Sequence, residues 1–233
     1  MKARVIINHE TPLAIVRALT KSGYRPVIIP PCGDVSSPIA GHPDIQVFVY
    51  GNRIYCHRNI PPEFVKQIED CNEVIITGTR LGNDYPRDIA FNIACTGAYA
   101  IHNFPFCDCT VRSALDADGV HCIDVRQGYS RCSTVIVDHE RIITADNSIY
   151  QKAASAGLHV LLIRPGHSEL PGYAHGFLGG ASGTRHDTVY FTGSIEDHPD
   201  GPSVISFIEA SGKKAVSLYT GPLLDLGSLL FLD

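Results

Sequence analysis

The sequence is 233 residues long, with 44% hydrophobic residues, 18% charged residues and a formal net charge of −5. This is an ordinary globular composition, and without a basic stripe it argues against binding to DNA or other nucleic acid. The apolar run near the first residue, Val5-Ile-Ile, is too short for a signal peptide or a membrane anchor. We therefore expect a cytoplasmic protein without a membrane partner, whose cysteines are reduced thiols.

The first predicted elements are a strand, a helix and a second strand. The strand covers 4–7, and the helix has Thr11 as its N-cap and Pro12 at its first position, and ends at Gly23. A strand over 25–29 follows, and then a connector over 30–41 that is rich in Pro, Gly and Ser. Strand, helix and strand are an incomplete unit, because the next segments each contain one strand more.

Three segments in succession predict the order strand, strand, helix, strand. The first has strands over 45–49, 53–56 and 73–76 and a helix over 62–71. The second has strands over 89–95, 98–102 and 120–125 and a helix capped by Thr110 and ended by Gly119. The third has strands over 133–137, 141–144 and 158–163 and a helix over about 148–156, capped by Asp146 or Asn147 and ended by Gly157.

A fourth copy has strands over 177–182, 188–191 and 214–218 and a helix over about 202–211, which the turn His198-Pro-Asp200 precedes. The last segment is a single strand over 226–232, and together with the first elements of the chain it completes a fifth unit. A ring closed by the two ends has no free sheet edge. We predict a single domain over 1–233, with units at about 44–84, 88–128, 132–172 and 176–222, and a fifth formed by 225–233 joined to 1–30.

A short pattern recurs at a fixed interval along the chain. Tyr85-Pro-Arg-Asp88, Tyr129-Ser-Arg-Cys132 and Tyr173-Ala-His-Gly176 are spaced by 44 residues, and one step back from Asp88 is Asp44. A regular period of this length is typical of a repeated supersecondary unit. It predicts that Asp44, Asp88, Cys132 and the Gly176 turn, with Asp225 in the fifth unit, lie at one level around an axis. We call these five positions the anchors, and expect function where they differ.

Five such units around a pseudo-fivefold axis resemble the pentein fold, a five-bladed α/β propeller. That superfamily includes guanidine-modifying enzymes such as arginine deiminases, dimethylarginine hydrolases and amidinotransferases, and also non-catalytic members such as the translation factor that keeps ribosomal subunits apart. The chain also resembles an uncharacterised bacterial branch of the superfamily. The motifs that carry this resemblance are His42-Pro-Asp, Tyr85-Pro-Arg-Asp-Ile, Gln127-Gly-Tyr-Ser-Arg-Cys, Gly176-Phe-Leu-Gly-Gly-Ala-Ser-Gly and Asp225-Leu-Gly-Ser.

The resemblance implies where the active site lies. Enzymes of the superfamily carry a His-x-Asp motif, a nucleophilic cysteine and a Gly-Gly turn at the starts of three units, and His42-Pro-Asp44, Arg131-Cys132 and Gly179-Gly180 resemble these. The cyclic order of the three is preserved if the chain is circularly permuted. Two features depart from the pattern: the Gly-Gly turn lacks neighbouring carboxylates, and Arg131 replaces the residue that often precedes the nucleophile.

These residues suit a cysteine-dependent hydrolase or transferase that acts on a small guanidine, amidine or amide compound and needs neither cofactor nor metal. Cys132 attacks as a thiolate, His42 transfers protons, and Asp44 orients His42 or binds the cationic end of the substrate. The substrate, a small cationic or amide-containing molecule, is expected to contact a further set of residues. That set is Asp88, Arg131, His175, Gly179, Gly180 and Asp225.

Each feature also has a purely structural interpretation. Cys132 is then a buried free thiol, His42-Pro-Asp44 a turn, and the glycines allow tight packing. Arg87 and Arg131 would form ion pairs with the acidic anchors and so lock neighbouring units together. The chain would then be a non-catalytic pentein that binds a protein, a ribonucleoprotein or a metabolite. A third hypothesis is a zinc site whose spacing matches no standard finger, formed by His102, Cys107, Cys109, His121 and Cys122.

Overall fold

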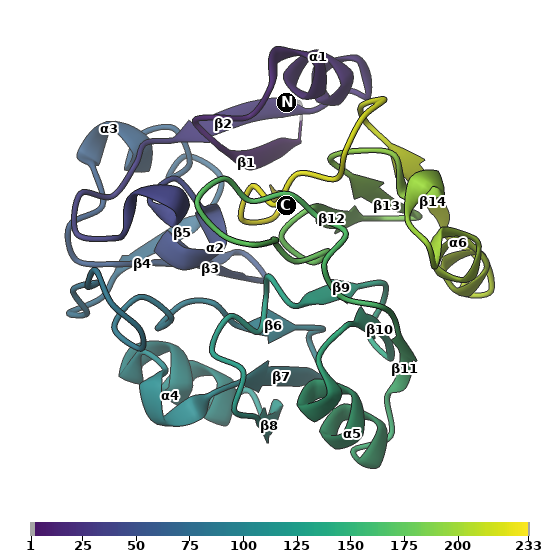
Figure 1. Cartoon of the computed structure of the whole chain (residues 1–233). Helices are drawn as coiled ribbons and strands as arrows, with labels where there is room; N and C mark the ends of the chain where they lie inside the picture. Colours follow the sequence, from purple (N-terminus) through teal and green to yellow (C-terminus); the bar gives the residue numbers. More distant parts are fainter. Residues whose placement is uncertain (1–2, 233) are drawn as a thin grey trace.

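Five three-stranded sheets follow one another around a ring (Figure 1). The structure is a computed structural model that describes residues 3–232. In every sheet the middle strand pairs antiparallel with one neighbour and parallel with the other, and a helix connects the parallel pair. The predicted α/β propeller of five ββαβ units is confirmed.

The units occur in chain order. The first contains α2 (Pro43–Gln46), β3 (Val47–Tyr50), β4 (Arg53–Cys56), α3 (Pro62–Val65) and β5 (Glu73–Ile76). The second contains β6 (Ala94–Cys95), β7 (Tyr99–His102), the 3₁₀ helix η2 (Phe104–Phe106), α4 (Cys109–Ala117) and β8 (His121–Asp124). The third contains β9 (Thr134–Ile136), β10 (Arg141–Thr144), α5 (Asn147–Ser155) and β11 (His159–Leu162).

The two ends of the chain close the ring. The fourth unit contains β12 (Ser182–Arg185), β13 (Thr188–Phe191), η3 (Ile195–Asp197), α6 (Gly201–Glu209) and β14 (Lys214–Ser217). The fifth contains β15 (Leu230–Phe231), β1 (Arg4–Asn8), α1 (Leu13–Lys21) and β2 (Arg25–Ile29), and η1 (Ser37–Ile39) lies in the connector to the first unit. The antiparallel pairing of β15 with β1 brings Val5 opposite Phe231 and confirms the predicted split unit.

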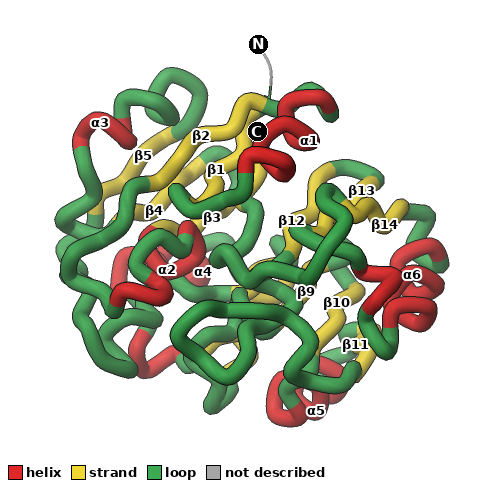
Figure 2. Tube along the Cα trace, turned by 45° about the horizontal axis from the view of Figure 1, so that its top comes forward, coloured by secondary structure: helices red, strands yellow, loops and turns green. Residues whose placement is uncertain are grey.

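The first strand of each unit lies towards the axis, and the longer helices lie on the outside (Figure 1). Strand β12 contacts both β9 and β15, and β9 contacts β6, so neighbouring units meet through these first strands. Seen from the direction of Figure 2, loops cover the centre of the ring. Apolar side chains form five clusters between sheets and helices, so the core is distributed around the ring rather than placed at its centre. Within the described chain, no helix has the length and apolar character needed to cross a bilayer.

The anchors do not begin strands, so several predicted strands are wrong. Asp44 and residues 45–46 belong to α2, 89–93 and 177–181 are loops that contain turns, and the strand predicted over 226–232 is reduced to β15. The reason is that the backbone at the anchors bonds to other units and not along a sheet. The N–H of Asp44 donates to Gly227 O (3.2 Å), that of Arg131 to Asn92 O (3.4 Å) and that of Gly180 to Cys132 O (2.9 Å). These bonds hold the anchors of different units close together.

Three predicted helices also differ in their bounds or caps. Helix α1 begins at Leu13, and its N-cap residue is Pro12 and not Thr11. Helix α3 ends at Val65 instead of residue 71, because the next turn has shifted to i→i+3 bonds, such as Gln67 N–H to Phe64 O (3.0 Å). Helix α4 begins one residue before Thr110, and its N-cap is Asp108, whose carboxylate accepts from the N–H groups of Thr110 and Val111. The predicted Asp146 cap of α5 is confirmed by its bond from the N–H of Ile149. The turn His198-Pro-Asp200 does precede α6, with Asp200 as its N-cap residue.

Candidate active site

Cys132 lies in the turn before β9 and is only 3% exposed. The side chain of Asn92, from the neighbouring unit, holds this turn in place. Its Oδ1 accepts the backbone N–H groups of Arg131 (2.8 Å) and Cys132 (3.3 Å), and its Nδ2 donates to Cys132 Sγ (3.2 Å). The sulfur therefore has a fixed position and one hydrogen-bond donor.

Asp44 is the carboxylate that contacts this sulfur. Sγ of Cys132 lies 3.3 Å from Asp44 Oδ1 and 3.2 Å from Oδ2, so the thiol can donate its proton there. Ser228 donates its hydroxyl to Asp44 Oδ2 at 2.6 Å. The backbone of Ser228 has a φ of 70°, which costs a non-glycine residue about 1–3 kcal/mol. The strained backbone of Ser228 thus lies at the point where its hydroxyl holds Asp44.

His42 is the N-cap residue of α2 and is 2% exposed. Its Nδ1 lies 3.9 Å from Asp225 Oδ1 and has no hydrogen-bond partner among residues 3–232. One His42 nitrogen, Cys132 Sγ and one Asp44 carboxylate oxygen all lie within 4.8 Å of one another. The structure thus brings together the three residues predicted to be catalytic, with Asp225 beside His42 and Asp44 beside Cys132.

Asp225 is fixed by backbone donors. Its Oδ2 accepts the N–H of Phe177 (2.8 Å) and its Oδ1 that of Gly227 (3.2 Å). A Cβ at Gly180 would lie 1.9 Å from Asp225 Oδ1, so only glycine lets the backbone approach this carboxylate. The Gly-Gly turn is therefore part of the packing around the site.

Burial governs the protonation of these groups. Burial, followed by the charges of Asp44 and Asp225, raises the pKa of Cys132 well above the ordinary value of 9.0. Burial also raises the pKa of Asp225, and His42 opposes that shift. Burial lowers the pKa of Arg131, while Asp44, Cys132 and Asp225 oppose that change. In the free protein Cys132 is therefore a neutral thiol at physiological pH.

A pocket of about 280 Å³ opens above these residues. Its floor contains His42, Cys132 and Asp225, and its rim Ala174 and His175. The walls are apolar or aromatic, namely Ile39, Ile45, Tyr129, Leu170, Tyr173 and Phe177. A second cavity, of about 200 Å³, reaches Asp44 and Arg131 between the inner strands.

The other predicted substrate-binding residues differ in their relation to the first pocket. His175 lines it, and Nδ1 of this side chain lies 3.0 Å from Gly176 O. Asp88 does not line it, because its Oδ2 accepts the Tyr129 hydroxyl at 2.7 Å behind the wall. Arg131 lines the second cavity, and its Nη1 donates to Thr134 O (3.0 Å) and Gly179 O (3.3 Å). Gly179 and Gly180 support the floor without lining it.

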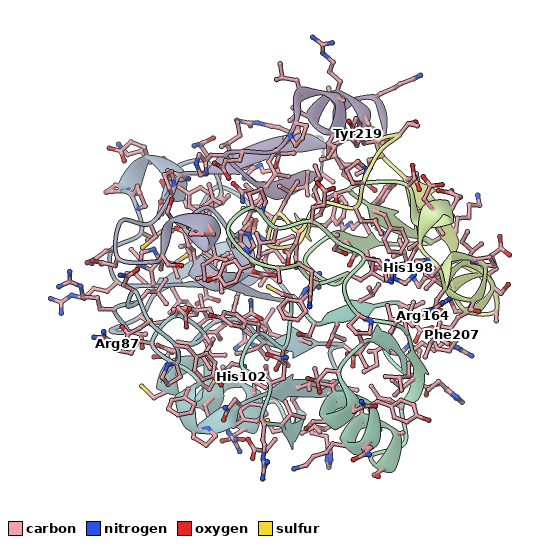
Figure 3. All side chains as sticks on the ribbon, viewed as in Figure 1. Arg87, His102, Arg164, His198, Phe207 and Tyr219 are labelled. Atoms are coloured by element: carbon pink, nitrogen blue, oxygen red, sulfur yellow. The ribbon has the colours of Figure 1, made fainter. Side chains whose placement is uncertain are left out.

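Two structural hypotheses are not met by the geometry of residues 3–232. Arg87 pairs with Asp84 at the outer edge of the molecule (Figure 3), and Arg131 bonds to carbonyls, so neither locks the acidic anchors. The residues of the predicted zinc site do not form a ligand cluster within the described chain, and the buried His102 has its Nδ1 3.1 Å from Asn92 O. In the described chain, the group that could hold a metal ion is His42, Asp44 and Cys132, and a thiolate, imidazole and carboxylate set suits Zn²⁺.

Two residues of the site, Asn92 and Ser228, escaped the sequence predictions. Asn92 is the one polar residue in the apolar run 89–94, and this isolated polar position could have identified it as a candidate site residue. Ser228 ends the Asp225-Leu-Gly-Ser motif, but its hydroxyl reaches Asp44 only because its backbone adopts a positive φ. Neither contact follows from local sequence, because each joins residues at least 40 positions apart.

Comparison with known proteins places the chain in a family. The model of a family of unknown function, DUF6873, matches residues 6–230. The chain belongs to DUF6873. No curated protein is significantly similar in sequence to this DUF6873 chain.

Solved structures resemble this DUF6873 chain in fold. DDAH from Pseudomonas aeruginosa, a cysteine-to-serine mutant complexed with citrulline, is 11% identical with a TM-score of 0.59, covering 100% of this chain and 99% of that one. A dimethylarginine dimethylaminohydrolase adduct with 4-chloro-2-hydroxymethylpyridine is 11% identical (TM-score 0.56; 93% and 92% covered). SxtG, an amidinotransferase of saxitoxin biosynthesis from Microseira wollei, is also 11% identical (TM-score 0.53; 93% and 88% covered). The predicted pentein fold is confirmed.

The raised thiol pKa values predict a loss of stability in alkali. A thiol that ionises at 9.0 when unfolded but higher when folded stabilises the fold fully below pH 9, and this contribution is lost as pH rises. Cys132 and Cys56, whose pKa is raised to about 12, each lower the free energy of unfolding by up to about 1.4 kcal/mol per pH unit above pH 9. We expect urea denaturation between pH 8 and 10 to show this slope.

Matched variants separate the contributions of the two thiols. Cys132→Ala and Cys56→Ala should each reduce the slope by about one proton. An unchanged slope in Cys132→Ala would mean that Cys132 ionises as readily in the folded as in the unfolded chain.

Proposed function

We propose that this chain is a cysteine-dependent hydrolase or transferase that acts on a small guanidine, amidine or amide compound. The observation that carries the proposal is the convergence of Cys132 Sγ, a His42 nitrogen and an Asp44 oxygen within 4.8 Å beneath an open pocket. The solved structures of the same fold include hydrolases and an amidinotransferase, which supports the reaction class. The eight cysteines are free thiols, which fits a reducing compartment, so we place the protein in the cytoplasm.

Cys132 becomes the nucleophile when a cation enters the pocket. The free thiol is neutral because of burial and the neighbouring carboxylates, and a bound amidinium beside the sulfur would lower its pKa again. The thiol proton passes to His42, directly or through one water molecule. The thiolate then attacks the central carbon of the amidinium, so that a C–S bond forms and the carbon becomes tetrahedral.

His42 serves both halves of the reaction. Protonated by the thiol, it donates this proton to the departing amine as the C–N bond breaks, and the substrate carbon, trigonal again, remains bonded to Cys132 as a thiouronium or thioimidate. His42 then accepts a proton from water, whose oxygen attacks the same carbon, and the C–S bond breaks to restore the thiol. An amine in place of water makes the protein a transferase. No cofactor is required for this sequence.

The carboxylates position the reacting groups. Asp225, beside His42 and facing the pocket, orients the imidazole and receives the cationic head of the substrate. Asp44, held by Ser228, keeps the thiol in place. The other predicted binding residues act at a distance or at the rim: Asp88 through Tyr129, Arg131 through Gly179, and His175 beside the entrance.

Two alkylating reagents of equal shape test the proposal. 2-Chloroacetamidine is cationic and 2-chloroacetamide is neutral, and each forms a thioether with loss of chloride. We expect Cys132 to react at least tenfold faster with the cationic reagent, relative to the ratio at the exposed Cys109 of the same chain, because the carboxylates concentrate the cation. Peptide mass spectrometry after timed labelling measures both sites at once.

The opposite result favours a different function. If Cys132 shows no preference for the cationic reagent, or remains unlabelled while Cys109 reacts, the pocket does not activate the thiol. The burial of Cys132 and its raised pKa would then support a non-catalytic pentein that binds a metabolite or a macromolecular partner. Asp44→Asn provides a check, since loss of this negative charge should lower the preference while keeping a hydrogen-bond acceptor next to the sulfur.

A further inference from the structure

The pocket above Cys132 has an unusual distribution of charge. Its acidic group, Asp225, lies at the floor, and no lysine or arginine is among the eleven residues that line it. Above the floor the walls consist of aliphatic and aromatic side chains, and outside the floor the one side chain that can gain a positive charge is His175 at the rim. The deep end therefore suits a cation, and the wall region suits an uncharged group.

The floor can accept one additional positive charge. Asp225 is the one carboxylate among the floor residues, and the pocket lining holds no lysine or arginine to pair with it. Asp225 has two backbone donors and lies 3.9 Å from His42 Nδ1, without an arginine or lysine partner in the described chain. A guanidinium or amidinium placed on Asp225 would balance the charge of the floor.

One wall of the pocket is a well-anchored segment, which we call the strap (residues 168–177). Its backbone is bonded at both ends: Glu169 N–H donates to Leu223 O (2.7 Å), Glu169 O accepts from Asp225 N–H (2.9 Å), and Gly176 N–H donates to Ser168 O (2.7 Å). The strap presents Leu170, Tyr173 and Ala174 to the pocket. Because these bonds fix its backbone, the strap holds its apolar side chains in place in the pocket wall.

The pocket volume limits the size of the part of a ligand that extends from its cationic head, which we call the tail. About 280 Å³ is at the low end of the range of about 300–1,000 Å³ that is usual for small-molecule sites. A charged tail group would be placed against Ile39, Ile45 and Phe177, where no side chain of opposite charge can receive it. The desolvation of an unpaired charge is far more costly than that of a neutral polar group.

We propose that the ligand of this pocket is a guanidinium or amidinium compound with an uncharged alkyl or aryl tail, and not an amino acid such as arginine. This inference rests on the proposed function for the position of the cationic head, but it concerns binding and not turnover. It separates this chain from the DDAH whose structure contains citrulline, a ligand with an amino acid tail. Tail selection follows from the absence of lysine and arginine in the lining and from the apolar strap.

Calorimetry on the Cys132→Ala variant tests tail selection without turnover. The probes are ethyl-, butyl- and benzylguanidinium, arginine, and agmatine, whose tail is a second cation. We expect butyl- and benzylguanidinium to bind at least tenfold more tightly than arginine and agmatine, with up to about a fourfold gain per methylene between ethyl and butyl. Arginine binding as tightly as butylguanidinium at pH 8 would overturn the inference.

A variant that is expected to gain affinity for arginine provides a second test of tail selection. Ala174 is an exposed strap residue, so Ala174→Arg can add a cation to the rim without disturbing the core. We expect Ala174→Arg to improve arginine binding at least fivefold relative to Ala174→Gln, a neutral side chain of similar reach. An equal effect of both variants on arginine would contradict the charge argument.

The two proposals can fail separately. If alkylguanidinium compounds bind as expected but Cys132 shows no preference for 2-chloroacetamidine, the pocket is a binding site and the catalytic proposal is wrong. If Cys132 does show that preference but arginine binds best, the reaction class stands and the inference about the tail is wrong.

Discussion

Cys132→Ser is expected to lower the turnover of the alkylguanidinium that binds most tightly by at least about 10³-fold, as judged by release of the amine or of ammonia. Attack on the amidinium carbon requires a strong nucleophile, and a serine hydroxyl at this position has no thiolate-like form near neutral pH. Asn92 and Asp44 can still hydrogen-bond the serine, so the fold and the pocket should be retained. The loss of turnover would therefore arise in the chemical step and not from a change in the fold or in binding.

Controls assign that loss to the site. Cys109→Ser, at an exposed thiol outside the pocket, should retain wild-type turnover. His42→Gln should reduce turnover by about 10²–10⁴-fold, the range expected when a general acid and base is removed. Comparable Kd values for the alkylguanidinium in wild type and Cys132→Ser would show that binding is intact. Turnover by Cys132→Ser within tenfold of wild type would refute the nucleophilic role.

The 44-residue period predicted the fold because it reports geometry that each unit must repeat. Hairpin, helix and parallel strand recur in every unit, and the two chain ends supply complementary parts of the fifth, which β15 and β1 complete. The same period brought Asp44, Asp88 and Cys132 to one level before any contact was known, and the split fifth unit added Asp225. Local sequence features were enough to predict the fold, because apolar periodicity and helix caps depend on residues within one unit.

The site itself was less predictable because it is made from contacts between units. The anchors were expected to begin strands, yet they lie in α2, in turns or in loops, and backbone N–H groups at or beside them donate to other units, as Gly180 does to Cys132 O. The sequence motif His42-Pro-Asp44 suggested that Asp44 orients His42, whereas the structure places Asp225 beside His42 and Asp44 against Cys132. Residues two positions apart can point to different partners when a proline and a helix start separate them, as Pro43 does at α2.

The Gly-Gly turn is where these inter-unit contacts are most compact, and it is the best site for a test of stability. Gly179 O accepts from Arg131 Nη1 (3.3 Å) and Ser182 Oγ (2.9 Å), and it lies 3.2 Å from Ser228 Oγ, whose proton bonds to Asp44. A Cβ at Gly179 would lie 2.4 Å from Cys132 O, and 2.6 Å from both Arg131 O and Thr134 N. All three are backbone atoms, so no side-chain rotation can relieve the overlap.

Gly179→Ala is therefore expected to destabilise the fold by about 3 kcal/mol or more, which lowers the Tm by roughly 6–12 °C for a chain of this size. Gly78→Ala is the matched control, because a Cβ there has no heavy atom within 4 Å, and its Tm should stay within about 2 °C of wild type. Thermal unfolding followed by circular dichroism measures both. Equal Tm values for the two variants would mean that the third and fourth units do not meet as closely as the structure has them. A selective loss in Gly179→Ala would show that the turn beside Cys132 also joins the two units.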